Sequence, residues 1–113
     1  MINFACKKLD LYEVMRCGLG LTKTEHAILL FLLDNDWETA NDVANKLKIS
    51  LATAQRSLKN LHSKELIERR QQNLDLGGYL FFYKAKSKEE IRTELKKILS
   101  NWMENVETSL NKW

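Results

Sequence analysis

One stretch of the sequence, SLATAQRSLKN at residues 50–60, carries the side chains best suited to recognising a ligand. A glutamine amide can bind adenine through two hydrogen bonds, and an arginine guanidinium can bind guanine in the same way. The methyl group of a threonine can contact the methyl group of thymine. Thr53, Gln55 and Arg56 therefore carry groups that can read base edges in a DNA major groove.

The same stretch also suits the sugar-phosphate backbone of DNA. Lys59 supplies a positive charge, and the Asn60 amide can donate to phosphate oxygens. Ser50 stands where a helix would begin, and a helix N-terminus offers free backbone N–H groups to an anion. We expect all three to contact phosphates, with Leu51 beside them at the start of the helix.

A helix over residues 51–63 would position these side chains. Ala54, Leu58 and Leu61 are spaced by four and then three residues, which places them on one side of a helix, toward a core. The polar residues then lie on its other sides. Because most amphipathic helices only cover a core, the neighbouring elements must show whether this one does more.

The preceding element is expected to be a second, shorter helix. Thr39 is a candidate cap for a helix over residues 40–47, and only Lys48 and Ile49 separate that helix from Ser50. Two short helices joined by so short a turn must cross steeply, which is helix-turn-helix geometry.

Two strands are expected after the polar helix, over residues 66–72 and 79–85. The second is rich in aromatic residues, and NLDLGG between them predicts a hairpin loop. The loop contains Asp75 and no positive residue, so its tip would repel phosphate. Positive charge lies instead at the base of the hairpin, where we expect DNA backbone contacts from Arg69, Arg70, Lys84 and Lys86.

Further helices are expected on either side of this unit. Thr22 and Glu25 form a capping-box pattern that opens an apolar helix to about residue 35, and Ser87 with Glu90 opens a last helix in the same way. A first helix is expected over residues 5–16. Together the elements predict a mainly α fold with a small β-hairpin (α+β), in a single domain of residues 1–113. Within this domain, residues 22–86 would form a winged helix-turn-helix. Dimerisation helices within residues 1–17 and 88–113 would flank it.

The order of these elements is similar to that of a known superfamily. Residues 39–70, TANDVANKLKISLATAQRSLKNLHSKELIERR, and residues 83–91, YKAKSKEEI, resemble the MarR/TrmB-like winged helix-turn-helix transcriptional regulators, the second most closely the archaeal TrmB type. The resemblance covers about residues 22–91. It implies a DNA-binding regulator that dimerises through its flanking helices, and we expect no separate effector domain. The wing departs from the pattern, because such regulators commonly carry an arginine near the tip where this chain has Asp75.

The last helix has a wider apolar side than a small domain needs. One apolar stripe begins at Ile91, and a second, adjacent stripe ends at Trp113. Either the helix folds onto its own domain, or it associates with a second copy of the chain. We expect a homodimer whose interface contains Leu95, Leu99, Trp102, Met103, Val106 and Leu110.

Composition and charge narrow the functional class. The chain has 113 residues, of which 44% are hydrophobic and 29% charged, as in one globular domain. Its longest apolar run, AILLFLL, is far shorter than the roughly 20 residues of a membrane helix, and we expect a cytoplasmic protein. Residues 40–86 hold nine Lys and Arg against four Asp and Glu, a local excess of +5 that favours a polyanionic partner.

The remaining reactive residues show no catalytic or metal-binding pattern. Cys6 and Cys17 are too few for a disulfide framework, and with His26 and His62 they form no close-spaced ligand pair, so we expect neither a metal nor a cofactor. Helical cysteines are more often small core residues, with redox sensing as the alternative. No nucleophile is accompanied by a base and an orienting partner, so we expect no enzyme activity.

Two functional hypotheses remain. The first is a sequence-specific, double-stranded-DNA-binding transcriptional regulator that acts as a homodimer on an inverted-repeat operator. The second is a winged helix used for protein–protein contact in a transcription assembly, with the aromatic strand or the last helix docking a partner. Binding to random duplex DNA across a salt series separates them, because phosphate contacts make affinity fall steeply with salt.

Overall fold

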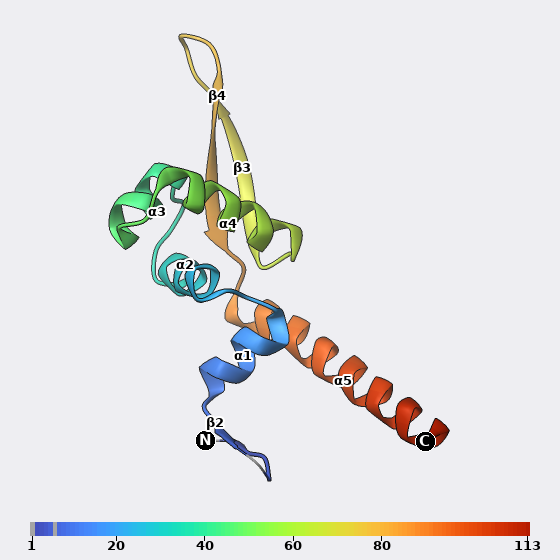
Figure 1. Ribbon diagram of the computed structural model, residues 1–113. Coiled ribbons are helices and arrows are strands. Elements are labelled where there is room, and N and C mark those ends of the chain that lie inside the picture. The colour runs from blue at the N-terminus through green and yellow to red at the C-terminus, as the bar shows by residue number, and fades with distance from the viewer. Residues whose placement is uncertain (1, 6) are drawn as a thin grey trace.

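The computed structural model describes residues 2–5 and 7–113, and Figure 1 shows the course of the chain. A hairpin and the end of the last helix project in different directions from a helical centre, so the molecule measures 62 × 24 × 24 Å. The expected α+β layout is confirmed. The elements are β1 (Ile2–Asn3), β2 (Lys8–Leu9), α1 (Leu11–Leu19), α2 (Lys23–Leu33), α3 (Ala40–Leu47), α4 (Leu51–Ser63), β3 (Ile67–Asn73), β4 (Tyr79–Ala85) and α5 (Lys88–Lys112).

Side-chain caps fix where the helices of the helix-turn-helix begin. The predicted caps Thr39 and Ser50 accept hydrogen bonds from the backbone N–H groups of Asp42 and Thr53, at 3.2 and 3.1 Å. Asp42 also accepts from the Thr39 N–H at 3.0 Å, which completes a capping box and is the main reason that the pKa of Asp42 is lowered. The bounds of α3 and α4 are therefore those expected from the sequence.

The core is built around α2 and α4. Ala54, Leu58 and Leu61 are fully buried, which confirms the inward side predicted for α4. They lie in one hydrophobic cluster with the buried side of α2 and with the start of β3. Because the apolar side of α4 packs in this cluster, the opposite side can carry polar residues. The other fully buried large side chains are Ile28, Leu29, Leu32, Val43, Leu66 and Ile67.

The N-terminal segment differs from the helix expected over residues 5–16 and from the flanking helix expected within residues 1–17. Strands β1 and β2 pair as a short antiparallel hairpin, and α1 begins only at Leu11. The reason is local: Asp10 Oδ1 accepts from the Glu13 N–H at 2.8 Å and caps the helix there. Cys6 lies outside the described residues, and Cys17 is exposed, contrary to its expected place in the core.

Two glycines explain why α1 continues past residue 17 and then ends. Gly18 lies within the helix, and a Cβ atom there would meet Leu95 Cδ1 at 2.6 Å, so its missing side chain lets α5 approach. Gly20 has φ 67°, the left-handed conformation that closes a helix at low cost. The first glycine of the Gly-Leu-Gly sequence is thus a packing residue, and only the second is a break.

The hairpin of β3 and β4 forms the wing. Ile67 pairs with Ala85 at its base and Asn73 with Tyr79 near its tip. Beside β4, the Glu38 N–H donates to the Tyr83 carbonyl at 2.9 Å, and the Tyr83 N–H donates to the Glu38 carbonyl at 2.8 Å. This bridge ties the connection between α2 and α3 to the wing and so holds the wing against the helices.

The last helix leaves the domain after its first turns. Ile91 is buried and Leu95 is half-buried against the core, whereas the later apolar residues are exposed. The alternative in which the whole helix folds onto its own domain is therefore wrong. Leu95, which is expected in the dimer interface, is already partly covered by α1 of the same chain, where it lies against Gly18. No helix in the described part of the chain is both long and apolar enough to cross a membrane.

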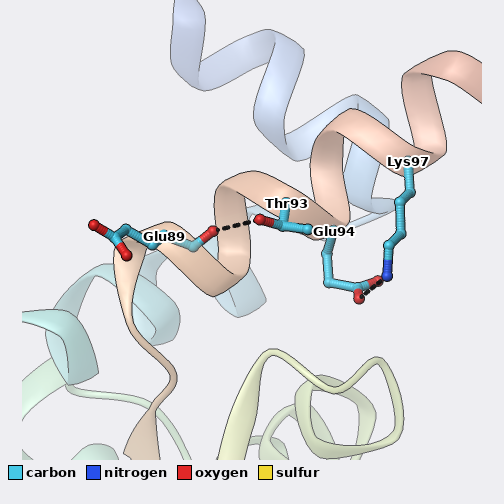
Figure 2. Close-up of polar contacts among 4 residues, drawn as sticks. All are labelled: Glu89, Thr93, Glu94 and Lys97. Carbon is cyan, nitrogen blue, oxygen red and sulfur yellow. Dashed lines mark hydrogen bonds and ion pairs between the residues drawn. The ribbon is translucent and has the colours of Figure 1, made fainter.

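Among the described residues, side chains on the polar side of α5 bond within their own helix. Figure 2 shows the Thr93 hydroxyl donating to the Glu89 carbonyl, at 2.9 Å, and the Lys97 ammonium 3.6 Å from the Glu94 carboxylate. The ion pair is exposed and spans one helical turn, so it contributes at most a few tenths of a kcal/mol.

Candidate nucleic-acid interface

The outer side of α4 is open to solvent. Gln55, Arg56 and Lys59 are exposed, while Thr53 is half-buried near the start of the helix. Leu51, in the first turn, is 40% exposed although it is a large apolar residue. The structure thus brings the residues predicted to read bases onto one accessible helix, with Lys59 one turn further along.

The N-terminus of α4 has a tight cap. The Ser50 hydroxyl accepts from the Thr53 N–H and donates to the Thr53 hydroxyl oxygen at 2.8 Å. Just before it, Lys48 has φ 55°, and the Ile49 N–H bonds to the Ala44 carbonyl at 3.0 Å. This left-handed residue turns the chain sharply between α3 and α4, which lie side by side over α2 in Figure 1.

Asn60, which is expected to contact a phosphate, makes a hydrogen bond to another helix of the same chain. Its Nδ2 donates to Glu25 Oε2 at 3.0 Å, and Glu25 is only 4% exposed. The amide is therefore already engaged within the chain, at the start of α2. We accordingly leave Asn60 out of the candidate interface.

The positive residues of the wing lie against aromatic rings. The Arg69 guanidinium lies 4.3 Å from the centroid of the Phe81 ring, and that of Arg70 lies 4.6 Å from the Trp37 ring. Lys84 lies 5.9 Å from Trp37, and its ammonium is 3.5 Å from Asp36. Such cation–π contacts limit the freedom of long side chains, so these charges are held close to the wing rather than extended into solvent.

Two of these partners were missed by the sequence reasoning. In the polar stretch DNDWET, residues 34–39, Trp37 contacts two of the predicted cations and Asp36 neutralises one of them. An isolated tryptophan within a polar turn was the available signal, since a large aromatic residue there needs a surface to cover. The pKa of the neighbouring Glu38 is raised, chiefly because the side chain is partly desolvated.

The wing tip is exposed and lacks positive charge, as expected from the sequence. Leu74, Asp75 and Leu76 are exposed, Leu76 completely so, and residues 74–78 include no Lys or Arg. Gly77 and Gly78 both have positive φ and close the loop. Positive charge is thus confined to the two strands.

Comparisons with known proteins identify the family. The model of the family described as sugar-specific transcriptional regulator TrmB matches residues 15–89. The chain belongs to the TrmB family. This membership confirms the resemblance found in the sequence and makes the protein a DNA-binding transcriptional regulator. The match includes all of α4 and the wing but ends in the first turn of α5, so it says nothing of the exposed apolar side of that helix.

Individual proteins resemble this chain in sequence or in fold. A structure of a possible transcriptional regulator from Methanosarcina mazei Go1 has 39% identity and a TM-score of 0.91, covering 100% of this chain and 96% of that one. An uncharacterised protein of Methanocaldococcus jannaschii is 27% identical over 113 residues, covering 100% of this chain and 83% of its own length. The S. aureus MepR–DNA complex, at 21% identity, a TM-score of 0.59 and coverage of 88% and 83%, shares the fold.

Within residues 2–5 and 7–113, no three His, Cys, Asp or Glu side chains lie together as metal ligands would. His26 is half-buried beside Tyr12, with ring centroids 5.7 Å apart, and burial lowers its pKa, with a smaller contribution from Arg16. It lies on α2, where Tyr12 of α1 packs beside it.

Proposed function

We propose that the protein is a homodimer that binds an inverted-repeat operator in double-stranded DNA, with one α4 helix of each subunit in a major groove. The observation that carries the proposal is the exposed polar side of α4, which holds Gln55 and Arg56 on a helix anchored by a fully buried apolar side. Those two side chains form bidentate hydrogen bonds with adenine and guanine. The remaining contacts that we propose are Ser50, Leu51, Thr53, Lys59, Arg69, Arg70, Lys84 and Lys86.

The proposed dimer is supported by the uncovered part of α5. Beyond Leu95, its large apolar residues are exposed along one side of the helix, and a monomer would leave this continuous surface in water. A second copy can cover it through a twofold axis, and two α4 helices related by that axis match an operator with inverted half-sites. The proposed interface contains Leu99, Trp102, Met103, Val106 and Leu110.

A salt series tests the proposal most directly. Affinity for duplex DNA is measured between about 50 and 200 mM salt, first on random sequence and then on fragments selected from a random pool. Each phosphate contact contributes a slope of about −0.9 to the logarithmic plot, so several contacts per subunit predict a steep loss of affinity. Selected fragments are expected to contain inverted repeats. A flat salt response would instead favour the protein-contact hypothesis, and selected sites without symmetry would contradict the dimeric mode.

Asp36 is expected to weaken DNA binding in the natural protein. Because its carboxylate pairs with Lys84, the variant Asp36→Asn frees this ammonium for a phosphate. We expect affinity for any duplex sequence to rise severalfold at low salt and the salt slope to steepen by about 0.9. The control is Asp34→Asn, which removes the same charge from the same connection without touching Lys84. Equal effects of the two variants would show that only net charge matters.

A further inference from the structure

The C-terminal half of α4 is bonded to the connection between α1 and α2. Asn60 donates to the buried Glu25, whose other carboxylate oxygen accepts from the Thr22 N–H at 3.0 Å. One turn further along, the Lys64 ammonium donates to the carbonyl of Leu19 at 3.1 Å and also to that of Gly20. Two side chains of the proposed DNA-reading helix thus hold residues 19–25.

These bonds join two parts of the molecule. Helix α1 packs on α5 where Leu95 meets Gly18, and together they form what we call the arm, residues 11–19 and 88–112. Helices α2, α3 and α4 with the wing form the rest of the domain. The chain passes from the arm to α2 through Gly20, whose φ of 67° marks a sharp change of direction. The position of α4 relative to the arm therefore depends on what holds this turn, together with the packing of Ile91 of α5 in the core.

Both bonds have a clear physical reason to be strong. The last carbonyls of α1 form the negative end of a helix, and the Lys64 ammonium meets them there. The carboxylate of Glu25 is buried and needs hydrogen-bond donors, of which Asn60 supplies one from another helix. Apolar packing is not directional, whereas these hydrogen bonds are, so they are suited to fixing an angle.

We propose that Lys64 and Asn60 are positioning residues that fix the angle between α4 and the arm and thereby set the half-site spacing that the dimer accepts. The inference rests on the proposed dimeric function. Two recognition helices enter successive major grooves only when they lie about 34–36 Å apart, roughly 10–10.5 base pairs. Because the arms form the proposed dimer interface, a change of angle at residues 19–25 moves both α4 helices and alters that separation.

The test measures binding to inverted repeats whose half-site spacing varies in steps of one base pair, and to a duplex with a single half-site. We expect the natural protein to show a sharp optimum. In Lys64→Met, the ratio of affinities between the best and the poorest spacing should fall by about tenfold, as expected for the loss of hydrogen bonds to a charged group. Affinity for the single half-site should stay within about threefold of that of the natural protein. Lys64→Arg should keep the sharp optimum of the natural protein. Asn60→Ala alone should reduce the difference in affinity between spacings. The control is Lys97→Met, which removes an exposed lysine from the polar side of α5.

The outcomes separate this inference from the proposed function. A natural protein that binds all spacings equally overturns the inverted-repeat mode and this inference with it. A sharp optimum that survives both Lys64→Met and Asn60→Ala overturns this inference alone. An equal loss of affinity for the half-site and the full operator would assign Lys64 to direct phosphate contact or to general stability, and it would also overturn the positioning role.

Discussion

Replacing Leu99 and Met103 with glutamate is expected to convert the dimer into a monomer and to lower affinity for the full operator by about two to four orders of magnitude. In the single chain these residues are 39% and 58% exposed, so the new carboxylates can reach water in the monomer. In the proposed dimer, by contrast, each carboxylate would enter an apolar interface without a partner, which is strongly unfavourable. Sedimentation measures the mass, and titration of a labelled operator measures the affinity.

The loss of DNA affinity follows from the loss of the second half-site. A dimer that has engaged one half-site presents its other α4 at a high effective concentration, and a monomer has no such advantage. The helix-turn-helix and wing should remain folded, because their core lies in α2, α3, α4 and the wing base. Circular dichroism should therefore change little between the natural protein and the double variant.

A matched control distinguishes the interface from added charge. Asn101→Glu with Thr108→Glu adds the same two negative charges on the opposite, polar side of α5. This control should remain dimeric and lose far less affinity for the full operator. If the double variant at Leu99 and Met103 keeps the dimer mass, this helix is not in the interface. If it becomes a monomer but binds the full operator as tightly as before, dimerisation is not coupled to recognition.

The elements that the sequence predicted well are those whose signals are local. The start of α3 at Thr39 and of α4 at Ser50 depends on side chains that bond to their own helix within three residues. The inward side of α4 follows from spacing alone, because Ala54, Leu58 and Leu61 can share only one side of a helix. The exposure of Gln55 and Arg56 follows for the same reason.

The features that could not be predicted depend on contacts between distant segments. Strand β1 pairs with β2 over two residues each, too few for a recognisable pattern. Periodicity showed that Leu95 is on an apolar side of α5 but could not show that it lies against Gly18 of α1 in the same chain. In the same way, Asn60 looks like a free polar residue until the fold brings Glu25 beside it, although 35 positions separate the two in the chain.

Replacing Arg56 with alanine is expected to have the second large effect, on specificity rather than on assembly. A true bidentate contact with guanine contributes about 1–3 kcal/mol of discrimination, so affinity for the natural operator should fall about five- to 150-fold. Because the exposed side chain packs on nothing essential, the stability of the fold should not change. Gln55→Ala should act similarly at a neighbouring base pair, with adenine in place of guanine.

The measurement that decides this prediction compares operators rather than proteins alone. Each base pair of the selected half-site is substituted in turn, and the affinities of natural protein and variant are measured over the whole panel. Arg56→Ala should lose discrimination at one base pair per half-site and keep it elsewhere, whereas Lys59→Ala, which would lose a phosphate contact, should weaken all operators alike and reduce the salt slope by about 1. This contrast separates base reading from general attraction, because both variants remove one positive charge from the same exposed side of α4.

If Arg56→Ala weakens every operator equally, the guanidinium binds the DNA backbone and α4 lies at a different angle in the groove. If the base preference and affinity are both unchanged, α4 does not enter the groove through this side, and the wing strands become the stronger candidate for recognition.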